Sequence, residues 1–163
     1  MTDLSPLLPA ARAIIESATA NKLKIATAES CTGGLVAGVL TEISGSSAVV
    51  DRGFVTYSND AKMEMLGVPK QLIERFGAVS RETALAMVAG ALARSQADIA
   101  VSITGIAGPT GGTPEKPVGL VHFASMRRGQ PALHLAHTFP DNGRDGIRLA
   151  SVAEALRLIQ ALI

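Results

Sequence analysis

The segment from Thr27 to Gly34, TAESCTGG, places an acid and three nucleophilic side chains between an apolar run and a glycine pair. The acid is Glu29, and the hydroxyl and thiol groups belong to Ser30, Cys31 and Thr32. The run KIATA before them is typical of a strand, and LVAGVL after them is typical of a helix. Because a hydroxyl or thiol beside a base can attack a carbonyl carbon, the segment indicates nucleophilic catalysis, with Ser30 and Cys31 both open as the nucleophile.

The same residue types also suit a purely structural role. Ser30 or Thr32 can cap a helix, and Cys31 can be a small buried apolar residue. A functional role for this segment is favoured over a purely structural one because two further strand ends are polar. These ends are Tyr57-Ser58-Asn59-Asp60 and Thr104-Gly105. Ligand sites in open α/β sheets lie at the carboxyl ends of strands. The sequence therefore predicts one site built from three strand ends.

The base that activates the nucleophile is predicted to be a residue other than histidine. His122, His134 and His137 all lie in the late strands, away from the three polar strand ends. Lys62 follows the second polar end by one helical turn, and a desolvated lysine can act as a base near neutral pH. The alternative is a solvated surface lysine. No metal site is predicted, since His134 and His137 are three residues apart and point to opposite faces of a strand.

Two features indicate binding of an anion. A helix that begins at Thr32-Gly33-Gly34 presents free N–H groups, which stabilise an anion or a developing oxyanion. The glycine-rich loop from Gly105 to Pro117 can serve as a lid or a phosphate cradle. Arg144 and Arg148, near the start of the last helix, can hold a phosphate or carboxylate, although isolated arginines are more often surface charges.

The elements that must position these residues alternate between helix and strand, and a hairpin follows. We expect helices over residues 7–21, 32 or 33–42, 58 or 59–66, 69–77, 80–96 and 144–163, and strands over 24–28, 49–57, 98–104, 118–126 and 132–140. In the last helix, the buried stripe is expected to be Leu149, Val152, Ala153, Leu156, Ile159 and Ile163. This order predicts a single domain over residues 1–163, an α/β fold built as a three-layer α/β/α sandwich with a mixed β-sheet.

Composition narrows the class of protein. The hydrophobic fraction is 47% and the aromatic fraction 3%, so the core must be aliphatic, and the apolar surplus fits either a homo-oligomer or a compact alanine-rich core. The net charge is +1 and the only adjacent basic pair is Arg127-Arg128, which argues against nucleic-acid binding. One cysteine, no signal-peptide pattern and no long apolar run predict a cytoplasmic protein that does not enter a membrane.

Five blocks along the chain together resemble one known family. The blocks TAESCTGG, GSSAVVDRGFVTYSNDAK, GAVSRETA, SITGIAGPTGG and KPVGLVHFA are similar to the C-terminal domain of the competence/damage-inducible CinA family. The resemblance covers residues from about Leu7 to the C-terminus. The N-terminal molybdopterin-binding-like domain of two-domain members has no counterpart here, so its ADP-ribose pyrophosphatase activity is not carried over.

The resemblance implies hydrolysis of nicotinamide mononucleotide (NMN) to nicotinic acid mononucleotide and ammonia, in pyridine nucleotide salvage. It implies Ser30 as the nucleophile and Lys62 as the base, with Tyr57 completing their hydrogen-bond network. Thr104 matches a Ser/Thr position of the family's site. An arginine of the last helix and the glycine-rich loop would hold the substrate phosphate. The scheme requires no cofactor and no metal, and the resemblance again favours a homo-oligomer.

Three other functions remain open at this point. The first is a non-enzymatic partner protein associated with competence or DNA damage, in which the pocket is a relic. The second is hydrolysis of a different amide or ester on the same scaffold. The third is a nucleotide-binding module that binds NMN without turnover.

Overall fold

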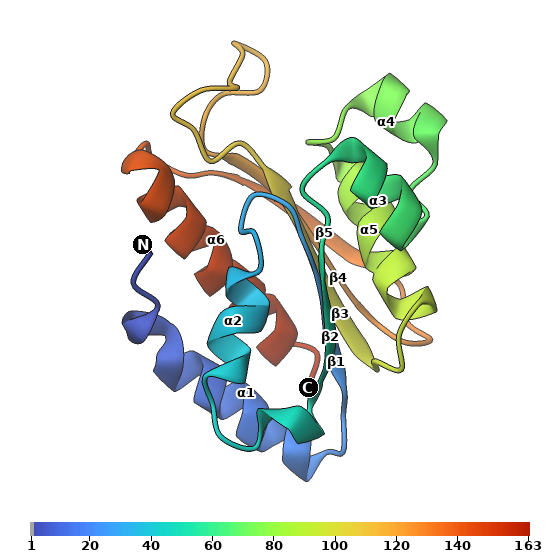
Figure 1. Ribbon diagram of the computed structural model, residues 1–163, viewed down its shortest axis with the longest axis vertical. Coiled ribbons are helices and arrows are strands. Elements are labelled where there is room, and N and C mark those ends of the chain that lie inside the picture. The colour runs from blue at the N-terminus through green and yellow to red at the C-terminus, as the bar shows by residue number, and fades with distance from the viewer. Residues whose placement is uncertain (1) are drawn as a thin grey trace.

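One mixed sheet forms the centre of the protein, with helices on both of its faces (Figure 1). The computed structural model describes residues 2–163. The strands are β1 (Ile25–Glu29), β2 (Val50–Val55), β3 (Ile99–Gly105), β4 (Leu120–Arg127) and β5 (Leu133–Thr138), in the order β2-β1-β3-β4-β5. Strand β1 is parallel to β2 and β3, whereas β4 is antiparallel to both β3 and β5. The carboxyl ends of β1, β2 and β3 therefore meet at one edge of the sheet.

Two helical layers complete the sandwich. Helices α1 (Leu8–Ala20), α2 (Leu35–Thr41) and α6 (Gly143–Gln160) cover one face, and α3 (Asn59–Leu66), α4 (Lys70–Phe76) and α5 (Arg81–Ala93) lie on the other side (Figure 1). Two short 3-10 helices span Ser5–Leu7 and Ser46–Ala48. This arrangement confirms the predicted three-layer α/β/α sandwich with a mixed sheet.

The two faces of the sheet differ in side-chain size. Ile25, Val101 and Ile103 are fully buried toward α1, α2 and α6, whereas Ala28 and Ala100 are fully buried toward α5. Successive side chains of a strand point to opposite faces, so each central strand supplies both cores. The small side chains leave room for α5 to pack close to β1 and β3.

The structure differs from the sequence-based expectation at two helices. Helix α2 begins at Leu35, because Gly33 and Gly34 adopt positive φ angles of 60° and 96° and form a turn. In α6, Ala153 is exposed, so its place in the predicted buried stripe is wrong. Ile147, which the predicted stripe omitted, is fully buried and lies closer to the start of that helix.

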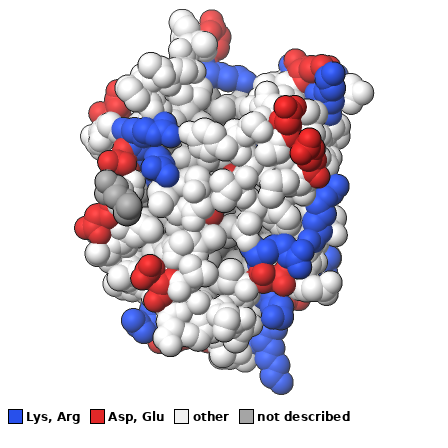
Figure 2. All heavy atoms as spheres, viewed as in Figure 1, with Lys and Arg blue, Asp and Glu red and all other residues white. Residues whose placement is uncertain are grey.

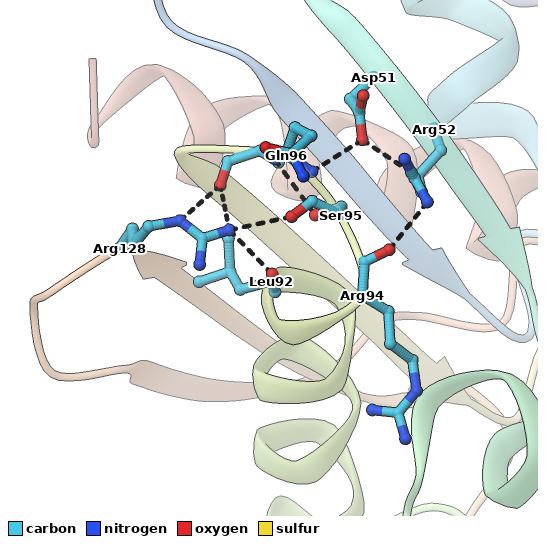
Figure 3. A network of polar contacts seen from close by, with 8 residues as sticks. Asp51, Arg52, Leu92, Arg94, Ser95, Gln96 and Arg128 are labelled. Carbon is cyan, nitrogen blue, oxygen red and sulfur yellow. Dashed lines mark hydrogen bonds and ion pairs between the residues drawn. The ribbon is translucent and has the colours of Figure 1, made fainter.

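Guanidinium groups satisfy the carbonyl end of α5 (Figure 3). Arg128, between β4 and β5, donates from Nη2 to the carbonyl oxygens of Leu92 (2.8 Å), Ser95 (3.2 Å) and Ala97 (2.7 Å). Helix C-termini leave carbonyl groups without partners inside the helix and carry partial negative charge. Arg128 therefore ties the helical layer to the β4–β5 hairpin.

Strand β2 supports the same helix end from the other side. Arg52 donates to the carbonyl oxygen of Arg94 at 2.9 Å, and its Nε donates to Asp51 at 2.7 Å. Asp51 in turn accepts the backbone N–H of Gln96 at 3.1 Å (Figure 3). The turn after α5 is therefore hydrogen-bonded both to β2, at one side of the sheet, and to the β4–β5 hairpin, at the other side.

Replacing Arg128 should destabilise the fold without touching the cavity described below. We expect Arg128→Ala to lower the free energy of unfolding by about 1–2 kcal/mol, because several carbonyl groups lose one charged donor. Urea denaturation measures the change. Arg157→Ala is the matched control, since it removes only an exposed pair with Glu154 and should cost at most about 0.5 kcal/mol. Equal midpoints for the two variants would contradict the role given to Arg128.

Candidate active site

The three polar strand ends surround one cavity of about 270 Å³. The turn after β1 contributes Ser30, and α3 contributes Lys62. Thr104 lies at the end of β3, Tyr57 lies between β2 and α3, and Arg144 lies in the first turn of α6. Of the residues predicted for the site, the cavity lining also includes Gly105. Elements from both helical layers and the sheet edge therefore build the cavity together.

Ser30 and Lys62 form a buried pair at the base of this cavity. The Lys62 Nζ lies 3.0 Å from Ser30 Oγ and donates to the Thr56 carbonyl oxygen at 2.9 Å. Lys62 is 1% exposed and Ser30 9% exposed. Burial lowers the pKa of Lys62 below its ordinary value of 10.5. In its neutral form, this amine can donate to Thr56 and accept the Ser30 hydroxyl proton, and such an arrangement activates a nucleophile.

Local sequence explains how Lys62 reaches the cavity. Ser58 caps α3, since its Oγ accepts the Ala61 N–H at 3.0 Å. Gly67 ends the helix in a left-handed conformation with φ 68°. The Thr56 N–H donates to the Glu29 carbonyl oxygen at 2.8 Å, which joins the end of β2 to the end of β1. This link brings the start of α3 beside the turn that follows β1.

Cys31 is poorly suited to be the nucleophile that the sequence left open. The side chain is 5% exposed, and burial raises the pKa of its thiol to about 12. Since the thiolate is the reactive form of cysteine, the thiol stays protonated and unreactive near neutral pH. The geometry favours Ser30.

The Glu29 carboxylate binds the N-terminus of α2, the helix end that the sequence analysis predicted to bind an anion. Its carboxylate, which is fully buried, accepts the N–H groups of Gly34 (3.1 Å), Val36 (3.0 Å) and Ala37 (2.9 Å). The Thr27 hydroxyl lies 3.2 Å from the same group. A carboxylate beside these N–H groups compensates the partial positive charge of the helix end.

The anion site predicted at Thr32-Gly33-Gly34 stays a prediction, but two of its N–H groups have partners within the protein. The Gly34 N–H is bound to Glu29, and the Gly33 N–H donates to the Ser30 carbonyl oxygen at 3.0 Å. None of these three residues belongs to the cavity lining. Sequence spacing alone could not show that the preceding acid turns back onto the helix.

The two arginines that the sequence predicted as anion ligands, both on α6, have different surroundings. Arg144 lines the cavity and donates to the Tyr57 hydroxyl at 2.7 Å and to the Gly108 carbonyl oxygen at 2.9 Å. Arg148 lies outside the lining and donates to the carbonyl oxygens of Cys31 at 3.2 Å and Thr32 at 3.1 Å. Only Arg144 is placed to meet a molecule that enters the cavity.

The glycine-rich loop is tied down by a lysine that the sequence did not single out. Lys116 donates from Nζ to the carbonyl oxygens of Phe76 at 2.8 Å and Val79 at 2.7 Å. Thr104, 1% exposed, donates to the Ala78 carbonyl oxygen at 2.7 Å. The loop and the start of α5 are thereby fixed to each other over the cavity. A signal for Lys116 lay only in its position near the end of the loop.

The histidines stand apart from this cavity. His122 and His134 pair with each other, with 3.0 Å between Nδ1 and Nε2, and His137 lies 3.7 Å from Glu154 across the other face. Within residues 2–163, no three His, Cys, Asp or Glu side chains converge as a metal site would require. In the same part of the chain, no helix is long and apolar enough to cross a membrane.

Comparison with known proteins identifies relatives over nearly the whole chain. The profile of the CinA C-terminal domain matches residues 8–163. The nicotinamide-nucleotide amidohydrolase PncC of Escherichia coli K12 is 45% identical over 159 residues, which cover 98% of this chain and 95% of that protein. The crystal structure of the competence/damage-inducible protein CihA from Agrobacterium tumefaciens superposes with a TM-score of 0.94 at 59% identity, covering 96% of this chain and 94% of that one.

Other relatives are much longer than this chain. A putative competence-damage inducible protein of Symbiobacterium thermophilum is 51% identical over 145 residues, which cover 85% of this chain. The chain spans 27–34% of the length of this protein and of similar long relatives. The match to them concerns one part of each.

The buried amine should make stability depend on pH in a defined direction. Because the pKa of Lys62 is lowered in the folded state, the unfolded chain binds more protons between that pKa and 10.5. The stability of the wild type relative to Lys62→Met should therefore rise as the pH rises through this window. Urea denaturation of both proteins at several pH values measures the difference. A difference that does not change with pH would show that Lys62 is not desolvated.

Proposed function

The chain belongs to the CinA C-terminal domain family, and on that premise we propose that it is an amidohydrolase converting NMN and water to nicotinic acid mononucleotide and ammonia. The observation that carries this proposal is the 3.0 Å contact between Ser30 Oγ and the buried Lys62 Nζ. The E. coli relative, which aligns with 98% of this chain, is named a nicotinamide-nucleotide amidohydrolase, and this name supports the choice of NMN as the substrate.

In the proposed reaction, Ser30 attacks the carboxamide carbon of NMN while neutral Lys62 accepts the hydroxyl proton. The tetrahedral intermediate collapses, Lys62 passes the proton to the departing nitrogen, and ammonia leaves an acyl-enzyme. Water then attacks the acyl carbon, Lys62 takes its proton, and nicotinic acid mononucleotide is released as the proton returns to Ser30. The same amine thus serves as base and acid in both halves of the reaction.

The charge of the cavity fits an anionic substrate. Its lining holds the cationic side chain of Arg144, the amine of Lys62, which is neutral in the proposed reaction, and no carboxylate among the described residues. Arg144 stands at the exposed end, where its guanidinium can bind a phosphate group bidentately. In our proposal, Arg144 binds the phosphate, and Thr104, Gly105 and the glycine-rich loop shape the pocket around the rest of the nucleotide.

The pathway, cellular location and oligomeric state of the protein are part of the same proposal. We propose a single-domain enzyme of pyridine nucleotide salvage that acts in the cytoplasm as a homo-oligomer and does not bind nucleic acid directly. On the face seen in Figure 2, Lys and Arg side chains follow one another down the lower right and lie in smaller groups elsewhere, with Asp or Glu beside several of them.

Turnover of NMN tests the Ser30–Lys62 assignment. We expect the purified protein to release ammonia from NMN with chelator present, and Ser30→Ala and Lys62→Ala each to lose at least about 10³-fold in kcat. Ser47→Ala, which changes an exposed serine outside the cavity, should keep full activity. NMN binding without turnover would favour a nucleotide-binding module. Neither binding nor turnover would favour a non-enzymatic partner in competence or DNA damage.

Arg144 should affect binding more than chemistry. Since its guanidinium lies at the cavity mouth, Arg144→Ala should raise KM for NMN by about 10-fold to 100-fold, the loss expected for a charged hydrogen bond, and leave kcat within about threefold. Initial rates over a range of NMN concentrations measure both constants. An unchanged KM would remove Arg144 from phosphate binding.

A further inference from the structure

Arg148 connects α6 to the turn that carries the nucleophile. Its Nε and Nη2 donate to two successive carbonyl oxygens, those of Cys31 at 3.2 Å and Thr32 at 3.1 Å. The side chain is partly buried, and within the described residues it has no carboxylate partner within ion-pair distance. Its donors are therefore directed at the peptide backbone and not at the cavity.

The turn that Arg148 contacts contains two glycines. Gly33 and Gly34 both have positive φ angles, a conformation that glycine adopts without steric cost. A Cβ atom at Gly33 would lie 3.3 Å from Arg148 Nη2, so the guanidinium packs directly against the turn. Without it, two carbonyl groups would lose charged donors.

Glu29 holds the opposite side of the same turn. Its carboxylate accepts the N–H groups of Gly34, Val36 and Ala37, while Arg148 binds the carbonyl groups of Cys31 and Thr32. The backbone after the nucleophile is thus fixed by an anion at its N–H groups and by a cation at its carbonyl groups.

This double attachment matters because the two members of the catalytic pair come from opposite helical layers. Ser30 leads into α2, whereas Lys62 lies on α3 across the sheet. The contact of 3.0 Å between their side chains depends on where the turn holds Ser30. A misplacement of about 1 Å in a reacting group can cost about 10²-fold in rate.

We propose that Arg148 is a positioning residue, which holds the turn after Ser30 so that the Ser30 hydroxyl stays in reach of Lys62, and that it does not bind substrate. This inference rests on the proposed function, because it assumes that Ser30 is the nucleophile. It assigns different tasks to two arginines that lie one turn apart on α6.

Steady-state kinetics separate positioning from binding. We expect Arg148→Ala to lower kcat for NMN about 10²-fold with KM within about twofold, and Arg148→Lys to lose less, since one ammonium group replaces a two-point fork. Added guanidinium ion should restore part of the activity of Arg148→Ala in a saturable manner. A purely structural defect would not be rescued in this way.

A covalent probe of Ser30 makes the test independent of NMN. Phenylmethanesulfonyl fluoride carries no phosphate: Ser30 Oγ bonds to its sulfur, the S–F bond breaks, fluoride leaves, and Lys62 takes the hydroxyl proton. We expect Ser30 to be sulfonylated about 10²-fold more slowly in Arg148→Ala than in the wild type. Intact-protein mass spectrometry follows the adduct.

Arg157→Ala is the matched control, because Arg157 lies on the same helix and is exposed. Arg157→Ala should change neither the kcat for NMN nor the rate at which Ser30 is sulfonylated.

Sulfonylation of Arg148→Ala at the wild-type rate, or a raised KM with kcat preserved, would overturn the proposal. A wild-type Ser30 that does not react would overturn it as well. If the wild type is sulfonylated but does not hydrolyse NMN, the proposed function fails while the sulfonylation rates still decide the role of Arg148. Should Arg148→Ala not fold, Arg148→Lys gives the same comparison.

Discussion

The burial of one amine beside one hydroxyl is the constraint on which the site depends. Lys62 is almost completely buried, and its Nζ contacts only neutral oxygen atoms, those of Ser30 and Thr56. A charged ammonium group is costly in such surroundings, so the fold favours the neutral amine. A neutral amine can accept a proton, so Lys62 is a candidate base for a site that does not use a histidine. The β2–β1 link and the cap of α3 serve to keep this amine in place.

The residues of the candidate site come from elements on both faces of the sheet. Large aliphatic side chains pack toward α6, and alanines pack toward α5. The turn after the candidate nucleophile is bound from the α6 side by Arg148, whereas the candidate base lies on α3, on the other side of the sheet. The site can therefore exist only at the sheet edge, where both layers are within reach of the same strand ends. Arg128 and Arg52 fix the far end of α5, so that this helix has a defined position along the sheet.

Much of this arrangement follows from residue types and spacing, and part does not. The sandwich was predictable because apolar periodicity and turn residues are local signals, and the three polar strand ends met as parallel topology requires. The start of α2 was misplaced because Gly33 and Gly34 adopt left-handed conformations that no spacing rule reveals. The separate surroundings of Arg144 and Arg148, and the return of Glu29 onto α2, depend on side-chain directions in three dimensions.

The chain contains one tyrosine and no tryptophan. That single tyrosine, Tyr57, lies at the mouth of the cavity with its hydroxyl bound to Arg144. The intrinsic ultraviolet fluorescence of the protein beyond the weak phenylalanine signal therefore originates entirely at the candidate site. Any anion that draws Arg144 away from this hydroxyl changes the environment of the only strong native fluorophore, so the protein carries an optical reporter of occupancy without any label.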